Sequence, residues 1–424
     1  MNYLSMTKDE LAREVTSLQA QYAAYRAAGL KLDISRGKPS PGQLALSDGM
    51  LECVTAADVT AEAPDCRNYG VLDGIPAMKE LFSALTGIPA KKIIVGGNSS
   101  LNMMYDTVAR AMLYGTCDSA RPWCREEKIK FLCPVPGYDR HFRICESLGI
   151  EMINVPMTAS GPDMEIVARL AGSDASVRGI WCVPKYSNPT GVTFSDECVR
   201  ALVSMKTAAP DFRIFWDNAY ALHDIYDEGD VLLDIFEAAA AAGNENRVYY
   251  FTSTSKITYS GGGVAMQAMS EENLRHTLPI LGTQTIGPDK VNQLRHVRFL
   301  RDREGVIAHM KRHASFLRPR FECLEETMEK TLGGLGIAEW TSPRGGYFIS
   351  LDVMPGCARR VYELARDAGV TLTDVGATFP YGIDPKDTNL RLAPSFTAMD
   401  EIQSASEILC CCVRLAAAEK LLEN

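Results

Sequence analysis

The chain has 424 residues, more than one hydrophobic core usually organises, so we expect two domains. A net charge of -9 argues against nucleic acid or an anionic membrane as the main partner, and no apolar run is long enough to span a membrane. Thirteen cysteines without a Cys-x-x-Cys pair, and an N-terminus unlike a signal peptide, favour reduced thiols and a cytoplasmic location.

The N-terminal part should hold one helix followed by irregular segments. A capping box from Thr7 to Glu10 predicts a helix that runs toward Gly29. Residues 32–39 are too rich in Gly and Pro to be helical, and residues 64–76 are irregular again. A helix at about residues 77–85 follows.

From residue 92 onward, short apolar strands alternate with helices. We expect strands at residues 92–95, 129–133, 152–155, 179–183, 212–216 and 248–251. This alternation is typical of a parallel sheet with helices on both faces, in which ligands bind beyond the carboxyl ends of the strands. The notable polar clusters follow such strands, so we expect them to meet at one edge of the sheet.

Beyond about residue 288 the pattern changes to long helices and fewer strands, including a helical stretch over residues 291–313. This predicts a smaller α+β domain. We place an N-terminal segment that packs with the small domain at residues 1–48, the large α/β domain at 49–300 and the small domain at 301–424.

The six histidines show no spacing typical of a metal site, and we expect no metal. His309 and His313 share one face of a predicted helix, with Lys311 and Arg312 between them. We interpret this face as basic and solvated.

One lysine stands at the end of the predicted strand 248–251. Small hydroxyl residues from Thr252 to Ser255 precede Lys256, and three glycines follow at 261–263. Burial lowers the pKa of an ammonium group and makes the free amine available, as a Schiff-base lysine requires. Hydroxyl groups and glycine amides can approach an anion closely. These features indicate a carbonyl cofactor that carries a phosphate, such as pyridoxal 5'-phosphate (PLP).

Other strand ends carry the groups that PLP would need. Asp217 could keep the ring nitrogen protonated, and Asn188 and Tyr220 could donate to the phenolate oxygen. Tyr138 could stack on the ring, and Arg391, between two leucines, could bind the substrate's α-carboxylate.

The phosphate requires amide and hydroxyl donors at a helix N-terminus. Asn98, Ser99 and Ser100 supply them, and Ser253 lies in the lysine loop. Each of these residues could by itself be an ordinary cap, turn or core residue. The interpretation depends on their convergence.

These motifs, in this order, resemble the class I aminotransferases of fold type I. They are Tyr69-x4-Gly74, Gly97–Ser100, Pro136–Tyr138, Asn188–Gly191, Asp217–Tyr220, Ser253–Lys256 and Asn389–Arg391. Residues 35–39, 138–141 and 284–290 look more specifically like the aspartate aminotransferase subgroup related to MocR-type aminotransferase domains.

The resemblance implies a fold type I PLP-transferase, with a large, mainly parallel sheet domain flanked by helices plus a smaller α+β domain. Lys256 would be the Schiff-base lysine and the base of the 1,3-proton transfer, and the other residues would have the roles given above. Family members are homodimers with shared active sites, so Tyr69 and Thr285 are expected to reach the cofactor phosphate of the partner subunit.

The sequence departs from the family pattern at two points. Val264 stands eight residues after the lysine, where the family has a phosphate-binding arginine. No obvious counterpart exists for the arginine that reads the distal carboxylate of dicarboxylic substrates. The candidate cations are Arg36, Lys38, Arg140 and Arg344, and the resemblance places the segment containing Arg36, Gly37 and Lys38 near the substrate.

Our leading hypothesis is ping-pong transamination through a Lys256 aldimine, with aspartate or glutamate as donor and 2-oxoglutarate or oxaloacetate as acceptor. The alternatives are an aminotransferase for alanine or aromatic amino acids, and a PLP-dependent lyase or decarboxylase. A ligand-sensing domain without catalysis is more remote, because the acidic charge disfavours a DNA-binding regulator.

Overall fold

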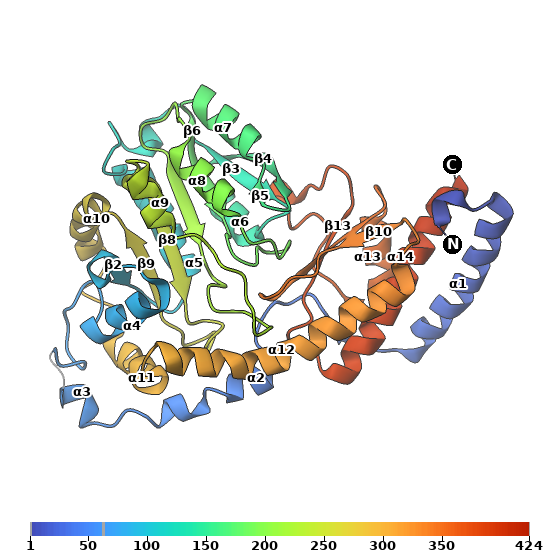
Figure 1. Cartoon of the computed structure of the whole chain (residues 1–424), viewed down its shortest axis with the longest axis horizontal. Coiled ribbons are helices and arrows are strands. Elements are labelled where there is room, and N and C mark those ends of the chain that lie inside the picture. The colour runs from blue at the N-terminus through green and yellow to red at the C-terminus, as the bar shows by residue number, and fades with distance from the viewer. Residues whose placement is uncertain (1, 62–63, 424) are drawn as a thin grey trace.

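A central sheet organises the computed structural model of the chain, which describes residues 2–61 and 64–423 (Figure 1). Within those residues the sheet has eight strands in the order β2-β9-β8-β7-β6-β3-β4-β5. The strands are β2 (Ile93–Val95), β3 (Lys130–Val135), β4 (Glu151–Thr158), β5 (Gly161–Pro162), β6 (Val177–Cys182), β7 (Arg213–Asp217), β8 (Val248–Ser253) and β9 (Ala265–Met269).

The middle of this sheet is parallel, from β4 through β3, β6 and β7 to β8. Its strands are buried on both faces: on β7, Ile214 and Trp216 contribute to one hydrophobic core and Phe215 to the other. The expected α/β architecture is therefore confirmed. Strand β9, antiparallel to β2 and β8, was not predicted. Its sequence, Ala-Met-Gln-Ala-Met, contains helix-favouring rather than β-branched residues.

Helices cover both faces of the sheet (Figure 1). The helices between residues 41 and 300 are α2 (Pro41–Ala45), α3 (Asp58–Ala61), α4 (Pro76–Thr86), α5 (Ser100–Tyr114), α6 (Asp139–Ser147), α7 (Met164–Ser173), α8 (Asp196–Ser204), α9 (Ile235–Ala241), α10 (Glu271–Gln284) and α11 (Lys290–Leu300).

A smaller unit lies at the other end of the long axis (Figure 1). Strand β11 (Ile349–Val353) pairs antiparallel with β10 (Ala338–Trp340) and β13 (Asn389–Leu392). Strand β1 (Leu32–Asp33) pairs in parallel with β12 (Val370–Thr371). Helices α1 (Lys8–Ala28), α13 (Ala358–Asp367), α14 (Met399–Glu423) and the distal half of α12 (Arg303–Leu332) pack around these strands.

The first helix begins and ends as the sequence predicts. Thr7 and Glu10 form a reciprocal capping box, and Gly29 ends the helix in the left-handed conformation with φ of 62°. Leu11 and Leu18 share a core with α14. Helix α12 contributes Val306 to the core of the large sheet and Leu317 to this second core. The domain boundaries given above stay a prediction.

The helical stretch expected over residues 291–313 is divided between two helices, because the chain breaks between α11 and α12. Arg301 has φ of 65°, and the Asp302 carboxylate caps α12 by accepting from the Gly305 amide. The solvated basic face is wrong for the histidines. His309 and His313 are 5% and 0% exposed, whereas Lys311 and Arg312 point to solvent. Residues at i and i+4 share a face, and this one is turned inward.

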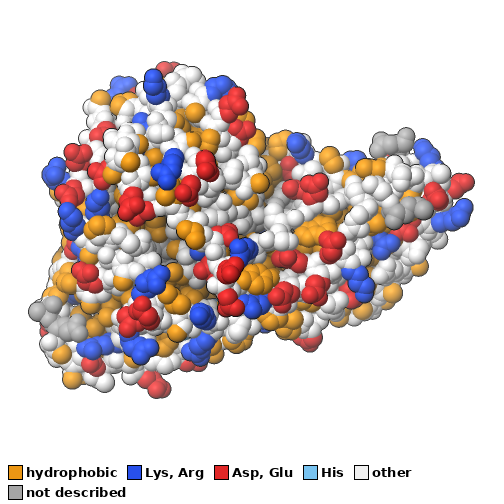
Figure 2. Space-filling view, viewed as in Figure 1, with side chains coloured by type: hydrophobic (Ala, Val, Ile, Leu, Met, Phe, Trp, Pro, Cys, Tyr) orange, Lys and Arg blue, Asp and Glu red, His pale blue; other side chains and the backbone are white. Residues whose placement is uncertain are grey.

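Acidic and basic side chains are interspersed over the face shown in Figure 2. Among the described residues, no helix is both long and apolar enough to cross a membrane. Within the same ranges, no group of three or more His, Cys, Asp or Glu side chains has a geometry suited to a metal ion.

Candidate active site

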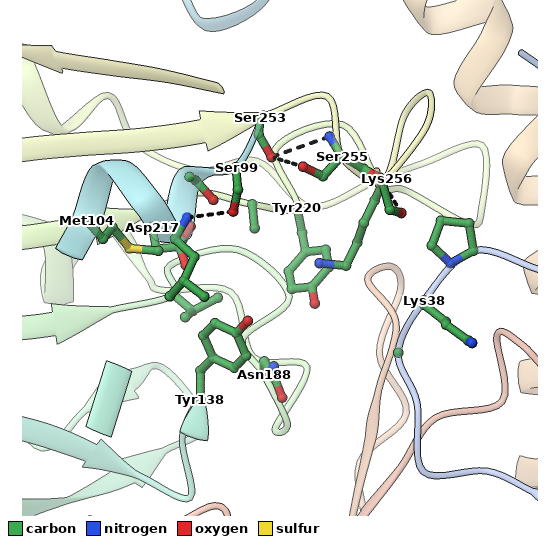
Figure 3. A pocket seen from close by; sticks show the side chains of 17 residues that line it. Lys38, Ser99, Met104, Tyr138, Asn188, Asp217, Tyr220, Ser253, Ser255 and Lys256 are labelled. Atoms are coloured by element: carbon green, nitrogen blue, oxygen red, sulfur yellow. Dashed lines mark hydrogen bonds between the residues drawn. The ribbon is translucent and has the colours of Figure 1, made fainter. Parts of the chain in front are cut away.

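Most of the predicted site residues meet at one cavity of about 270 Å³ (Figure 3). Asp217 ends β7, and Lys256 follows β8 by three residues, so two parallel strands deliver both groups to the same edge of the sheet. The predicted residues that line the cavity are Gly37, Lys38, Ser99, Ser100, Tyr138, Asn188, Asp217, Tyr220, Ser253 and Lys256.

Lys256 lies in a tight turn after β8 and reaches toward Tyr220 (Figure 3). Two bonds hold the base of this turn: the Thr254 amide donates to the Val264 carbonyl at 2.8 Å, and the Val264 amide donates to the Thr254 hydroxyl at 2.9 Å. Lys256 Nζ is 4.9 Å from the centre of the Tyr220 ring. Burial lowers the pKa of the lysine, Asp217 opposes the shift and Arg391 adds to it. A neutral amine is therefore more accessible here than in water.

Asp217 is a buried carboxylate with one oxygen unpaired. Its Oδ2 is 3.0 Å from His141 Nε2, and its Oδ1 has no hydrogen-bond partner. A buried carboxylate oxygen without a donor is costly, so this oxygen suits a cationic N–H such as a protonated pyridine nitrogen.

His141 is a site residue that our sequence reasoning did not single out. It stacks on Trp181, with ring centroids 4.3 Å apart and planes 10° from parallel, and this packing aims Nε2 at Asp217. The available signal was its place three residues after Tyr138, on the same helical face.

The serine end of the cavity offers hydroxyl and amide donors. Ser99 is the N-cap of α5 and accepts from the Leu101 amide, and the Ser253 and Ser255 hydroxyls are 3.1 Å apart (Figure 3). Ser260 also lines the cavity. The Val264 side chain is buried in the core beneath, so position 264 presents no group to this end.

Tyr138 and Asn188 lie at the opposite end of the cavity from these serines (Figure 3). Burial raises the pKa of both Tyr138 and Tyr220, so their hydroxyls remain protonated donors at neutral pH. The side-chain oxygen Oδ1 of Asn188 accepts a hydrogen bond from Arg391 at 3.4 Å.

Arg391 comes from β13 of the small sheet, and its side chain is 10% exposed. Its guanidinium donates to Asp139 at 2.9 Å and lies over the Phe348 ring at 4.9 Å. Asp139, which sequence reasoning did not assign, therefore neutralises this cation at the edge of the site. An incoming carboxylate would compete with Asp139 for the same fork of donors.

Of the four cations considered for a distal carboxylate, Lys38 lines the cavity. Its ammonium lies 3.9 Å from the centre of the Phe396 ring. The side chains of the other three, Arg36, Arg140 and Arg344, are 67%, 59% and 49% exposed and face Asp33, Asp139 and Glu228.

Five predicted residues are not part of the cavity lining: Arg36 and Arg391, described above, and Asn98, Tyr69 and Thr285. Asn98 donates to the Gly261 carbonyl, and together with Thr285 it lines a second cavity of about 300 Å³. Tyr69 is 81% exposed. The loops that contain Tyr69 and Thr285 lie side by side. Lys290, just after the second loop, donates from its ammonium to the carbonyl of Gly70, next to Tyr69, at 3.1 Å.

Comparison with known proteins gives one consistent result. The family model described as aspartate amino-transferase matches residues 6–424. An aspartate aminotransferase of Corynebacterium glutamicum is 47% identical over 403 residues, which cover 95% of this chain and 93% of that protein.

Solved structures agree. The crystal structure of an aspartate transaminase from Corynebacterium glutamicum matches with a TM-score of 0.97 and 45% identity over 99% of each chain. LysN of Thermus thermophilus, an α-aminoadipate aminotransferase complexed with N-(5'-phosphopyridoxyl)-L-leucine, shares the fold, with a TM-score of 0.73 and 20% identity over 97% of each chain. The chain therefore belongs to the aspartate aminotransferase family.

Proposed function

We propose that the protein is a PLP-dependent transaminase that exchanges the amino group of aspartate or glutamate with 2-oxoglutarate or oxaloacetate. The observation that carries the proposal is the pairing, in one cavity, of a half-buried lysine of lowered pKa with a buried carboxylate oxygen that has no donor. The two groups match the two ends of the chemistry that PLP requires: an amine for its aldehyde and an anion for its ring nitrogen.

The residues present fit this cofactor. Asp217 would hold the ring nitrogen, Tyr220 and Asn188 the phenolate oxygen, Tyr138 the ring face, and the serine end of the cavity the phosphate. When bound, PLP supplies an electron sink for the negative charge that develops at the substrate Cα. Lys256 Nζ is the base that would move the Cα proton, since burial lowers its pKa and makes the neutral amine more accessible than in water.

Arg391 orients the substrate by its α-carboxylate. Its near burial and its contact with Asn188 restrict the orientation of the guanidinium, and a fixed guanidinium would hold the carboxylate in one place. Asp139 holds the same guanidinium when no substrate is bound, so the site does not carry an unpaired buried cation.

Lys38 is our candidate for the distal carboxylate, because it is in the cavity lining, whereas Arg36 is not and pairs with Asp33. The Lys38 ammonium lies over the Phe396 ring and is directed away from Lys256 in Figure 3, so it would have to turn inward to meet a substrate. A charge-assisted pair is worth about 1.5–3 kcal/mol, or roughly 10- to 100-fold in kcat/KM. Lys38→Met should lower kcat/KM for aspartate by that factor and leave alanine turnover nearly unchanged. Arg36→Met, the matched control two residues away, should change neither value appreciably.

We also propose a homodimer with composite active sites. The support is the exposure of Tyr69 and of Ile286, which is 60% exposed, on two adjacent loops that do not reach the cavity of their own chain. If Tyr69→Ala and Lys256→Ala variants are mixed under subunit exchange, one hybrid site holds both intact residues and activity should partly return. Failure to complement despite proven exchange would contradict this arrangement.

The function itself is tested by absorbance and half-reactions. The purified protein with PLP should show a visible band that borohydride removes and that Lys256→Ala lacks. Single additions of aspartate or glutamate should convert the band without any 2-oxo acid, and alanine and phenylalanine should do so far more slowly. Release of ammonia or carbon dioxide would instead identify the lyase or decarboxylase alternative, and a preference for alanine or phenylalanine would overturn the substrate assignment.

A further inference from the structure

A buried histidine of α12, His309, contacts the carbonyl of the residue after Lys256, and a second buried histidine, His313, packs against His309. His309 Nε2 is 2.8 Å from the Ile257 carbonyl oxygen, and the Nε2 atoms of His309 and His313 are 3.2 Å apart. Ile257 comes directly after Lys256, and its amide closes the turn by donating to the Thr254 carbonyl. His309 therefore meets the chain where the turn leaves the lysine.

The neighbouring Gln43 defines where the proton of His313 lies. The Ser40 amide donates to Gln43 Oε1 at 3.1 Å, which assigns the other amide atom, Nε2, as a donor. Nε2 is 3.2 Å from His313 Nδ1 and 3.1 Å from the Tyr347 hydroxyl. His313 Nδ1 must then accept, so a neutral His313 carries its proton on Nε2.

Both histidines are neutral at pH 7, because burial lowers the pKa of His309 and lowers that of His313 to about 4. A carbonyl only accepts, so His309 also carries its proton on Nε2. Two N–H groups that face each other cannot bond together. His309 therefore donates to the Ile257 carbonyl, and His313 packs against the His309 ring, with the two ring centroids 4.9 Å apart.

The same network reaches the other end of the lysine side chain. Gln43 belongs to α2, and Tyr347 precedes β11 of the small sheet. The Tyr347 ring lies 5.7 Å from Lys256 Nζ. One chain of buried polar contacts thus touches both the backbone beside Lys256 and the surroundings of its amine, and it joins the N-terminal segment to the small sheet.

We propose that His309 and His313 are positioning residues: His309 clamps the Ile257 carbonyl, His313 holds the His309 ring in place, and together they keep Lys256 in its reactive position. The proposal rests on the proposed role of Lys256 in transamination. Without the clamp the turn keeps its covalent connection, but its last carbonyl loses its side-chain donor, and the lysine amine samples a wider volume.

Paired substitutions at each histidine separate the donor from the bulk of the side chain. Glutamine places an amide nitrogen near the position of Nε2, whereas asparagine is too short to reach that position. His276 provides a matched control, because its Nε2 contacts a backbone carbonyl, that of Gly115, far along the chain from the lysine turn. The variants are His309→Asn, His309→Gln, His313→Asn, His313→Gln and His276→Asn.

In the PLP-loaded enzyme, each asparagine variant should lower kcat about 10- to 100-fold with little change in KM, since the Ile257 carbonyl loses its donor or that donor loses its support. The pH midpoint of the visible band should shift as well. The glutamine variants should stay within about threefold of wild type, and His276→Asn should change neither kcat nor the band. Amide hydrogen exchange in residues 254–260 should be about tenfold faster in the asparagine variants alone.

The proposal is overturned if the asparagine variants keep kcat, the band and the exchange rates of wild type, or if they lose only thermal stability as His276→Asn does. A wild-type protein without a visible band would refute the proposed function, while the exchange comparison, which needs no cofactor, would still decide on the clamp. If the asparagine variants do not fold, Gln43→Met frees His313 Nδ1 and should accelerate exchange in the same segment; unchanged exchange would then refute the clamp.

Discussion

Two buried carboxylates, Asp211 and Asp217, lie near opposite ends of strand β7 and differ in how fully their oxygens are hydrogen-bonded. Asp211, just before the strand, accepts at Oδ2 from Ser119 at 2.6 Å and from Trp123 at 2.9 Å, and its Oδ1 pairs with Arg178. Asp217, at the far end, has a bond to His141 on one oxygen and none on the other. A fully paired carboxylate stabilises the fold, whereas a half-paired one keeps capacity for a ligand. The same strand therefore ends in a fully paired structural group, Asp211, and in Asp217, the group proposed to bind the cofactor.

The largest expected effect on turnover comes from replacing Lys256. Lys256→Ala should reduce turnover by about 10³-fold or more, because the variant lacks both the covalent anchor and the base. Its melting temperature should not fall, since a desolvated amine is removed. Near-normal turnover with fresh PLP, measured by a coupled assay, would show that the functional end is placed incorrectly.

Asp217→Asn should come next, with a loss of roughly 10²- to 10⁴-fold in kcat/KM, equivalent to about 3–5 kcal/mol for a buried cation left without its anion. Affinity for PLP should fall too, and equilibrium titration of the visible band measures it. The comparison predicts a much smaller change in the free energy of unfolding of the apoprotein. Asp217→Glu should retain more activity than Asp217→Asn, and equal rates would remove the ring-nitrogen role.

Asp211→Asn should show the reverse pattern. Removing the charge that faces Arg178 should lower the free energy of unfolding by about 3 kcal/mol, because that guanidinium is itself only 12% exposed. Urea titration followed by circular dichroism measures this loss. The kcat/KM of the folded fraction should stay within about twofold of wild type. A large catalytic loss with unchanged stability would contradict the assignment of Asp211 to stability and of Asp217 to catalysis.

As the pH falls, the contribution of His313 to stability should be lost first. Burial lowers the pKa of His313 from 6.5 to about 4, so the unfolded chain binds more protons than the native state between these values. Stability should therefore decrease as pH falls from about 6.5 to 4, by up to about 3 kcal/mol from this group.

Asp211 responds in a lower range of pH. Burial by itself would raise the pKa of the Asp211 carboxyl. Hydrogen bonds from Ser119, Trp123 and Arg178 outweigh burial and bring this pKa below its usual 3.8. Its stabilisation is present above pH 3.8 and is lost only below. Urea titrations at several pH values should show the histidine contribution disappear in His313→Gln and the lower-pH contribution disappear in Asp211→Asn.

Much of this site could be predicted because its residues follow strands. Lys256, Asp217 and Asn188 each stand just beyond an apolar run, and parallel strands bring such positions together whatever the details of packing. Contacts between distant segments could not be predicted in this way. Asp139 meets Arg391 across 252 positions of the chain, and no local pattern contains that distance.

The histidines of α12 show where pattern reasoning fails. Two basic residues between His309 and His313 suggested a solvated face, yet on a helix the intervening residues point elsewhere. That face is buried because two segments distant in the sequence pack against it: α2, through Gln43, and the lysine turn, through Ile257.

The sequence by itself determined the alternation of strands and helices, the capping of α1 and the identity of the residues at the strand ends, because these depend on local periodicity and local hydrogen bonds. Only the tertiary structure decided the antiparallel β9, the break between α11 and α12, the unpaired oxygen of Asp217 and the presence of Lys38, rather than Arg36, in the cavity lining. Pairing, burial and side-chain direction arise when distant segments exclude water from one another, and that information is absent from any short window of the chain.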